Sequence, residues 1–135
     1  MAKPIIFSGL VLSAALSFAA MPAQVSADPA PAKADAAKGK LIFMRCAACH
    51  NVKAGQPNKV GPNLAGVVGH KAGMVKGFNY SAAMKGAKIT WDDATLDKWL
   101  TRPASVVPGT SMVFAGLPKA EDRKAVIAYL KKPVP

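Results

Sequence analysis

The feature that most constrains this chain is the run Cys46-Ala47-Ala48-Cys49-His50. Two thiols three positions apart lie on the same side of a helical turn, so both can reach the edge of one planar ligand. The next residue, His50, can then turn its imidazole onto a metal at the centre of that ligand. A C-x-x-C-H run is typical of a c-type haem attachment site. The sequence therefore predicts one haem c, bound covalently through Cys46 and Cys49.

Two other uses of a C-x-x-C pair stay open from these residues alone, namely a redox disulfide and half of a zinc site. A disulfide oxidoreductase would need a βαβ context, and the pattern of the chain indicates none. A tetrahedral zinc site would need two further good ligands, whereas the whole chain holds two cysteines and two histidines. Covalent haem is therefore favoured over both alternatives.

The N-terminus has the pattern of a secretory signal. Lys3 supplies a positive charge, an apolar stretch covers residues 5–20, and small residues before Asp28 form a cleavage site. We expect residues 1–27 to be a cleaved signal peptide and residues 28–34 to be a flexible N-terminus. An uncleaved membrane anchor is the alternative, because the apolar stretch lies near the lower limit of roughly 17–25 residues for a membrane span. Export to the periplasm agrees with haem attachment, which occurs outside the cytoplasm in bacteria.

The chain of 135 residues carries a formal net charge of +11 at pH 7. A strongly basic surface favours an acidic partner or a membrane surface and accelerates association with it. The lysines are dispersed rather than run together, and nucleic acid is a poor partner for an exported haem protein. The charge therefore predicts acidic protein partners, transient contact with membrane complexes and no nucleic acid.

Helical periodicity and turn residues alternate along the rest of the chain. Thr90 followed by Asp93 resembles a capping box, and Pro103 should end the helix that follows. Glycines and prolines interrupt the stretch after the C-x-x-C-H run, which suits a segment wrapped around a flat apolar cofactor. The predicted helices cover residues 34–45, 80–84, 92–102 and 119–130, and the predicted loops cover residues 51–77 and 104–117.

Met112 follows a turn defined by Pro108 and Gly109. Methionine is usually a filler of apolar cores. A methionine that binds a metal must instead be held in place by a stiff segment, and this turn provides one. The other methionines beyond the signal, Met44, Met74 and Met84, lack such a setting, so Met112 is the candidate for a second metal ligand.

From Gly39 to Lys131 the chain resembles a class I cytochrome c, close to the bacterial cytochromes c2 and the mitochondrial type. The resemblance covers a cytochrome c domain over residues 35–135. It implies an all-α fold in which about four helices and long loops wrap around the haem. The matching segments, in the order of the family, are Gly39…Phe43…CAACH, Gly61-Pro62-Asn63-Leu64-x-Gly66, Gly77-Phe78-Asn79-Tyr80-Ser81, Ile89-Thr90-Trp91, Thr95-Leu96…Leu100, Pro108-Gly109-Thr110-x-Met112 and Arg123…Ala128-Tyr129-Leu130.

The resemblance also implies the ligands of the iron. His50 would be the proximal ligand, and its other ring nitrogen would donate to the carbonyl of Pro62. Met112 would be the distal ligand, and ligation by histidine and methionine raises the reduction potential. These two residues are the predicted metal ligands of the chain.

Further residues would contact the haem if the family pattern holds. Tyr80 and Trp91 would donate hydrogen bonds to a propionate. Trp99 stands where a tyrosine often donates to the methionine sulfur, and its indole N–H is the corresponding donor. His70 stands where an arginine often lies near a propionate, so it is either a surface histidine or a titrating group that couples the potential to pH.

An iron with both axial positions filled leaves no site for a substrate, so the sequence predicts no catalytic residue and no enzyme. The resemblance implies a soluble, monomeric electron carrier. It would move single electrons from a quinol-oxidising complex of the bc1 type to a terminal oxidase or a photosynthetic reaction centre. Arg45, Lys59 and Lys119 resemble basic residues around the exposed haem edge. The alternatives are a haem enzyme or gas sensor with a labile Met112 ligand, and a dedicated electron acceptor of a periplasmic dehydrogenase.

Overall fold

The computed structural model describes residues 31–135, and the predicted signal peptide 1–27 lies outside them. The described part is helical, with no β-strand beyond an isolated bridge between Lys71 and Thr90, which confirms the all-α prediction. No helix in it is long and apolar enough to cross a bilayer. The helices are α1 (Pro31–Ala47), α2 (Ala82–Gly86), α3 (Asp93–Thr101), α4 (Pro103–Val106) and α5 (Ala120–Lys131).

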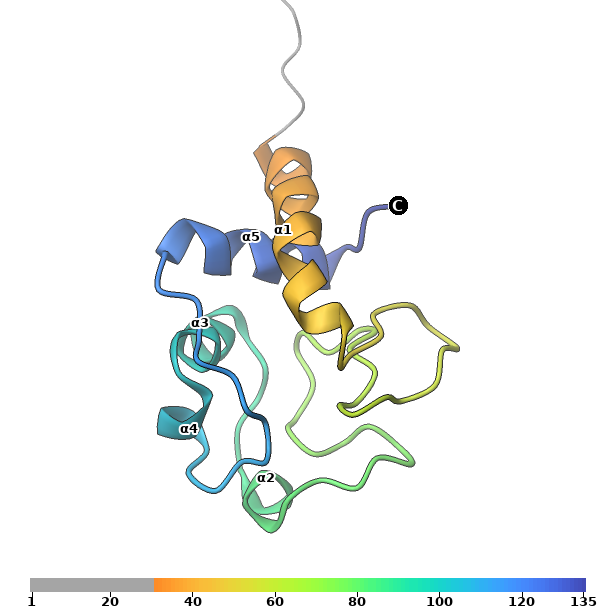
Figure 1. Cartoon of the computed structure of the whole chain (residues 1–135), viewed down its shortest axis with the longest axis vertical. Coiled ribbons are helices and arrows are strands. Elements are labelled where there is room, and N and C mark those ends of the chain that lie inside the picture. The colour runs from red at the N-terminus through yellow and green to blue at the C-terminus, as the bar shows by residue number, and fades with distance from the viewer. Residues whose placement is uncertain (1–30) are drawn as a thin grey trace, which may run out of the picture.

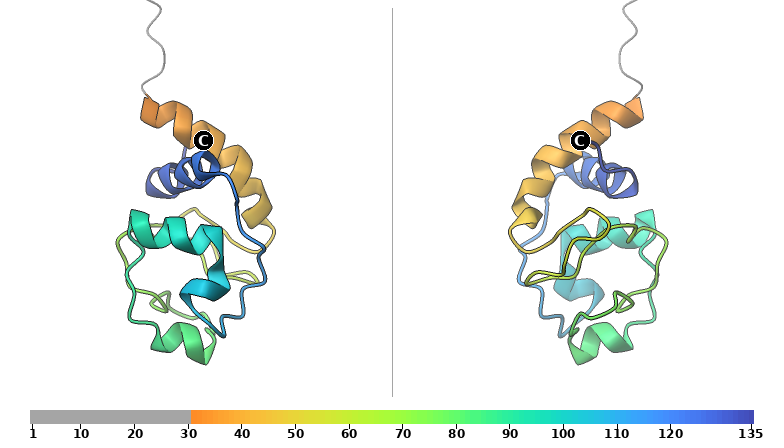
Figure 2. Two further views of the ribbon diagram at one scale, coloured as in Figure 1. Left: turned by 90° about the vertical axis from the view of Figure 1, so that its left-hand side faces the viewer. Right: turned by 90° about the vertical axis from the view of Figure 1, so that its right-hand side faces the viewer.

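The two longest helices, α1 and α5, pack against each other at one end of the molecule, and α2 lies at the opposite end (Figures 1 and 2). The contact between α1 and α5 depends on Gly39. A Cβ atom at this position would lie 2.5 Å from the carbonyl carbon of Ala125 and 2.8 Å from the Cβ of Tyr129. One turn further along α1, the ring of Phe43 lies 5.2 Å from that of Tyr129. The glycine therefore lets two backbones approach, and the aromatic pair fills the space beside them.

Helix α1 is longer than predicted. It begins at Pro31, so residues 31–34 of the segment expected to be flexible form its first turn. Proline is well tolerated in the first turn of a helix, because the N–H that it lacks would have no helical acceptor there. At the other end α1 reaches Ala47, two residues beyond the predicted end at Arg45. Cys46 therefore projects from the last turn of a helix rather than from a loop.

Two short-range caps set the starts of α2 and α3. The hydroxyl of Ser81 accepts a hydrogen bond from the amide of Met84, so α2 begins at Ala82 rather than at the predicted residue 80. The carboxylate of Asp92 accepts from the amide of Thr95 at 2.7 Å and caps α3. The predicted N-cap at Thr90 was wrong. Asp92 lies directly before the first helical residue, and its carboxylate supplies the acceptor that a capping side chain must provide.

The predicted loop 104–117 begins with a short helix, α4, which has Pro103 in its first turn. The chain then returns past the end of α3, where the amide of Leu117 donates to the carbonyl of Leu100 at 2.7 Å. At Gly116 a Cβ atom would lie 2.9 Å from the carbonyl carbon of Thr101, so only glycine fits this approach. The segment that carries Met112 is thereby attached at both ends to α3 and α4.

Arg123 joins the helices to this returning segment. Its guanidinium donates to the carboxylate of Asp97 on α3 at 2.7 Å and to the carbonyl oxygens of Leu117 and Pro118. The arginine side chain is largely buried, with 12% of it exposed. One side chain of α5 therefore fixes α3 and the end of the 107–117 segment to each other.

Candidate haem-binding site

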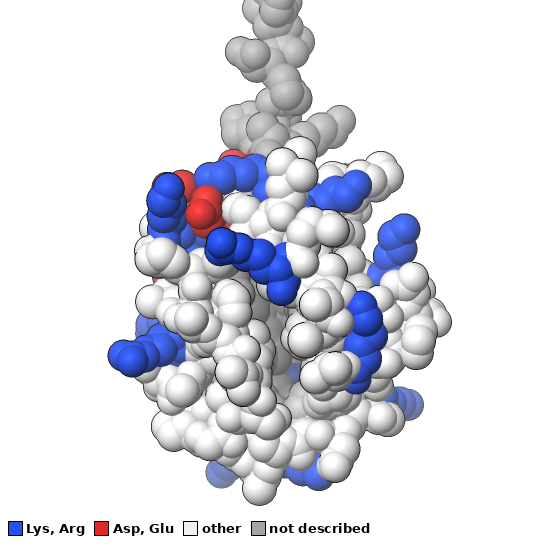
Figure 3. Space-filling model, viewed as in Figure 1, with Lys and Arg blue, Asp and Glu red and all other residues white. Residues whose placement is uncertain are grey.

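The molecule contains a cavity of about 450 Å³ between the end of α1, the loops after it, α3 and the 107–117 segment. This volume lies within the range of roughly 300–1,000 Å³ that is usual for cofactor sites. Its opening is visible as a hollow in the middle of the face in Figure 3. The cavity brings together every site residue predicted from the sequence: Cys46, Cys49, His50, Pro62, Tyr80, Trp91, Trp99 and Met112.

The two cysteines lie where α1 ends. The amides of Cys49 and His50 both donate to the carbonyl of Cys46, so the C-x-x-C-H run continues the helix as a tight turn. Both thiols are free and both line the cavity. Burial raises the pKa of the Cys46 thiol, which the nearby Arg45 partly offsets. The Cys46 sulfur is therefore protonated at neutral pH, and both thiols are free to form thioether bonds.

His50 is held by a carbonyl group on the facing loop. Its Nδ1 lies 2.8 Å from the oxygen of Pro62. A carbonyl oxygen can only accept, so Nδ1 carries the proton and Nε2 keeps its lone pair. Burial lowers the pKa of His50, the hydrogen bond to Pro62 partly offsets this, and the positive charge of Lys59 lowers the pKa further. The imidazole is therefore neutral at pH 7 and presents a nitrogen able to bind a metal.

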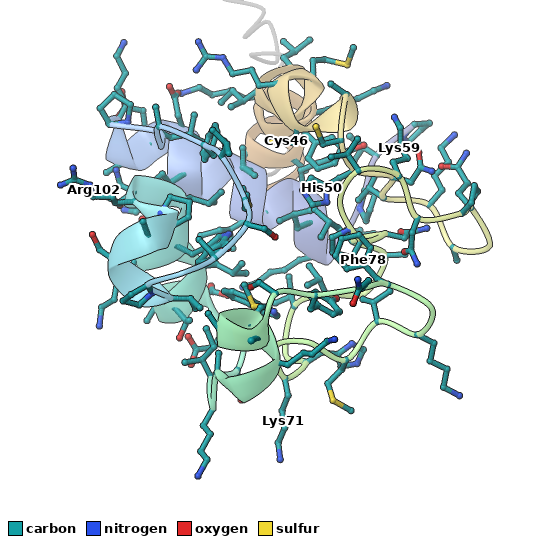
Figure 4. All side chains as sticks on the ribbon, turned by 60° about the horizontal axis from the view of Figure 1, so that its bottom comes forward. Cys46, His50, Lys59, Lys71, Phe78 and Arg102 are labelled. Carbon is teal, nitrogen blue, oxygen red and sulfur yellow. The ribbon has the colours of Figure 1, made fainter. Side chains whose placement is uncertain are left out.

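Loop 59–62 covers one side of this imidazole. The amide of Gly61 donates to the carbonyl of Cys49 at 2.8 Å, which ties the loop to the attachment turn. A Cβ atom at Gly61 would lie 2.7 Å from both ring nitrogens of His50, so glycine is required here for space. Lys59 adds a second tie, because its Nζ lies 2.5 Å from the carbonyl of Ala47. Figure 4 shows Cys46, His50 and Lys59 around the end of α1.

Met112 lies on the wall formed by the 107–117 segment. Its amide donates to the hydroxyl of Thr110 at 3.3 Å, and the amide of Thr110 donates to the carbonyl of Val107. The structure also places Met74 and Met84 on the cavity wall, which the sequence analysis did not foresee. Met84 is buried, whereas Met74 is 67% exposed at the opening. The thioether of Met112 lies on a segment whose ends are attached to α3 and α4.

Aromatic side chains form much of the remaining wall. Trp91 and Trp99 are buried and meet edge to face, with ring centroids 5.1 Å apart. The ring of Tyr80 meets that of Phe78 at 4.7 Å, and burial raises the pKa of the Tyr80 hydroxyl. Phe78 also lines the cavity, and sequence reasoning gave it no role in the site. An isolated aromatic in a loop carries no periodic signal, so only its position shows that it belongs to the site.

His70 also reaches the cavity, with the neighbouring Lys71. His70 is exposed, and its carbonyl accepts a hydrogen bond from the amide of Trp91 at 2.8 Å. The backbone therefore joins these two wall residues.

The donor set fits a c-type haem. Two thiols at one end of an apolar cavity can form thioether bonds, a neutral imidazole next to them presents a free nitrogen, and a thioether lies on another wall of the same cavity. Apolar and aromatic side chains dominate the lining, as a largely apolar macrocycle requires. A helical shell around a cavity of this kind defines a c-type cytochrome of class I.

Comparisons with known proteins agree. The family model for cytochrome c matches residues 36–132. The chain is 52% identical over 99 residues to cytochrome c2 of Rhodomicrobium vannielii, covering 73% of this chain and 79% of that protein. It is 53% identical over 98 residues to cytochrome c2 iso-2 of Magnetospirillum molischianum, covering 73% of this chain and 97% of that protein.

Among solved structures, cytochrome cH from Methylobacterium extorquens matches with a TM-score of 0.68 and 48% sequence identity, covering 72% of this chain and 97% of that one. The chain belongs to the cytochrome c family, within class I and close to the cytochromes c2. It carries haem c, bound through Cys46 and Cys49, and members of this family are electron carriers.

Proposed function

We propose that the chain is a soluble periplasmic carrier of single electrons whose iron is bound by His50 and Met112, and that it is not an enzyme. The observation that carries this proposal is the placement of both side chains on the walls of one cavity, from segments far apart in the sequence. Bound haem supplies an iron that cycles between the ferrous and ferric states. The other residues of the site hold the ligands, exclude water and adjust the energies of the two states.

His50 would bind through Nε2, because Nδ1 is committed to the carbonyl of Pro62. That hydrogen bond fixes the ring orientation and makes the imidazole a stronger donor. Met112 would supply the sixth ligand, and its soft sulfur favours the ferrous state and so raises the potential. With His50 and Met112 holding the iron in both oxidation states, the protein would need little rearrangement when an electron enters or leaves.

Tyr80 and Trp91 would donate hydrogen bonds to a propionate, and Trp99 would donate towards the sulfur of Met112. Trp91 and Trp99 are buried residues that line the cavity, so a cofactor bound there can accept a hydrogen bond from either indole N–H. The eight residues predicted from the sequence therefore have compatible roles within a single site.

The proposed partners are acidic redox proteins, because the chain carries a net charge of +11. We place the carrier between a quinol-oxidising complex of the bc1 type and a terminal oxidase or photosynthetic reaction centre, with transient contacts and a monomeric state. A periplasmic dehydrogenase that delivers electrons to this chain would fit the same surface chemistry. Residues 1–27, as a cleaved signal peptide, would direct the protein to the periplasm.

The ligand assignment is tested by Met112→Ala in the haem-loaded protein, with Met74→Ala as the matched control. Loss of the sulfur ligand should abolish the sulfur-to-iron charge-transfer band of the oxidised protein and lower the midpoint potential. Met74→Ala should leave both unchanged. If Met112→Ala preserves the band and the potential, the proposed sixth ligand is wrong.

A carbon monoxide titration of the reduced protein tests the choice between a carrier and a haem enzyme or gas sensor. A stable Met112 ligand should prevent binding of carbon monoxide to the wild-type protein, whereas Met112→Ala should bind it. Ready binding by the wild type would favour the ligand-binding alternative.

A further inference from the structure

The charges on the two walls of the cavity differ sharply. Residues 51–91, here called the loop lobe, contain six lysines and no acidic residue: Lys53, Lys59, Lys71, Lys76, Lys85 and Lys88. Residues 103–118, here called the neutral lip, contain no Lys, Arg, His, Asp or Glu at all. Both segments supply side chains to the cavity wall. The opening therefore has an uncharged side, formed by the neutral lip, and a basic side, to which Lys71 of the loop lobe and Arg45 at the end of α1 contribute.

The positive charge of the loop lobe is not offset from elsewhere. All acidic residues in the described part of the chain lie on α1, α3 and α5 or cap one of them: Asp35, Asp92, Asp93, Asp97, Glu121 and Asp122. Three of these already pair with cations on α1 or α5. The acidic residues visible in Figure 3 lie mainly at the upper left, away from the opening. In Figure 4 Lys71 extends outwards from the loop lobe.

The neutral lip is exposed as well as uncharged. Val113, directly after Met112, is fully exposed, and Val60 of the loop lobe is 81% exposed. Met74, also at the opening, is 67% exposed. All three line the cavity. Large apolar side chains with this exposure around one opening indicate a contact surface for another protein.

We infer that this opening fits an acidic redox protein that places an uncharged, apolar patch against the neutral lip and its carboxylates against the loop lobe and the adjoining Arg45, away from the lip. This inference rests on the proposed carrier function and adds how the partner is oriented. The lysines accelerate encounter from one side, because long-range attraction acts before contact. Val113 and its neighbours then form the dry part of the interface, where a charged side chain would lose its hydration.

The proposed role of the loop-lobe lysines is tested with two double variants of equal net charge. A purified bacterial cytochrome c oxidase serves as the probe. Lys71→Gln/Lys76→Gln removes charge from the loop lobe, and Lys124→Gln/Lys132→Gln removes the same charge from α5 and the C-terminal segment. We expect the first pair to slow bimolecular oxidation about fivefold at low ionic strength and to flatten its salt dependence. The control pair should change the rate less than twofold.

The proposed apolar contact at the neutral lip is tested with Val113→Lys and the same oxidase. A partner with carboxylates all around its contact site would react faster with this variant at low ionic strength. A partner with an apolar patch at this place should react about tenfold more slowly, since a lysine would have to be desolvated there. Val113→Thr, which is similar in shape and uncharged, should stay within about twofold of the wild type.

Hexacyanoferrate(III), a small oxidant that needs no docking surface, separates failure of this inference from failure of the carrier function. It should oxidise Val113→Lys at least as fast as the wild type, because the added lysine attracts an anion. Equal slowing of the oxidase reaction by the two double variants, or faster oxidation of Val113→Lys by the oxidase, would overturn the one-sided arrangement. Slow oxidation of every form by hexacyanoferrate(III) would instead count against electron transfer by this chain.

Discussion

Gly61 should be the position where a single added methyl group disturbs the site most. In Gly61→Ala the new Cβ would lie 2.7 Å from both ring nitrogens of His50, roughly 0.7 Å inside ordinary contact. The loop cannot simply move away, because the Gly61 amide is bonded to Cys49 and the Gly61 carbonyl to the amide of Lys59. The imidazole and the loop must therefore separate at the cost of the bond from His50 to Pro62.

The expected loss of stability follows from two terms. Overpacking in a well-filled site costs about 1–3 kcal/mol. Loss of the partly buried hydrogen bond between His50 and Pro62 costs about 1 kcal/mol more. We therefore expect Gly61→Ala to lower the free energy of unfolding by about 2–4 kcal/mol, measured by urea titration of the haem-loaded protein with far-ultraviolet circular dichroism. The midpoint potential should also rise, because the imidazole becomes a weaker donor to ferric iron.

Gly86→Ala is the matched control. Gly86 ends α2, and nothing lies within 4 Å of a Cβ atom placed there. Alanine favours helix over glycine, so this variant should unfold at the same or slightly higher urea concentration than the wild type. If Gly61→Ala loses no more unfolding free energy than Gly86→Ala and has the midpoint potential of the wild type, loop 59–62 is not in the close contact with His50 that the structure indicates.

Three further predictions concern packing, acid stability and the attachment turn. Gly39→Ala should lower the free energy of unfolding by about 1–3 kcal/mol, because its Cβ would meet the backbone of α5; unchanged urea unfolding would contradict this close approach. The amide of Thr95 holds the pKa of Asp92 below its ordinary value of about 4, so this carboxylate stabilises the fold above that pH and the contribution is lost as the pH falls through its lowered pKa. Asp92→Asn keeps a capping oxygen but does not titrate, so its thermal midpoint should fall less than that of the wild type between pH 5 and pH 2. Lys59→Met should speed amide hydrogen exchange at Gly61 about fivefold, the equivalent of losing one hydrogen bond, while Lys53→Met leaves it unchanged; equal exchange in both would show that the Lys59 tie is not formed in solution.

The sequence by itself determined the chemistry of the site and the class of fold. The C-x-x-C-H run needs no tertiary contact to be recognised, because both thiols and the imidazole lie within a single turn of chain. Periodicity located the longer helices to within about three residues, since each depends on contacts three or four positions apart. The stiff turn before Met112 likewise separated this methionine from Met74 and Met84, and ligation by Met112 stays a prediction for the variant to test.

Only the tertiary structure decided which distant groups meet. It brought Met74, Met84 and Phe78 to the same cavity as Met112, although nothing local distinguishes them. In the structure Asp92 caps α3. Lys59, which the sequence indicates only as a surface cation, donates a hydrogen bond to the end of α1. Such contacts depend on the paths of loops rather than on local propensity. The uncharged lip and the basic lobe are both visible in the sequence, but only folding places them on opposite sides of one opening.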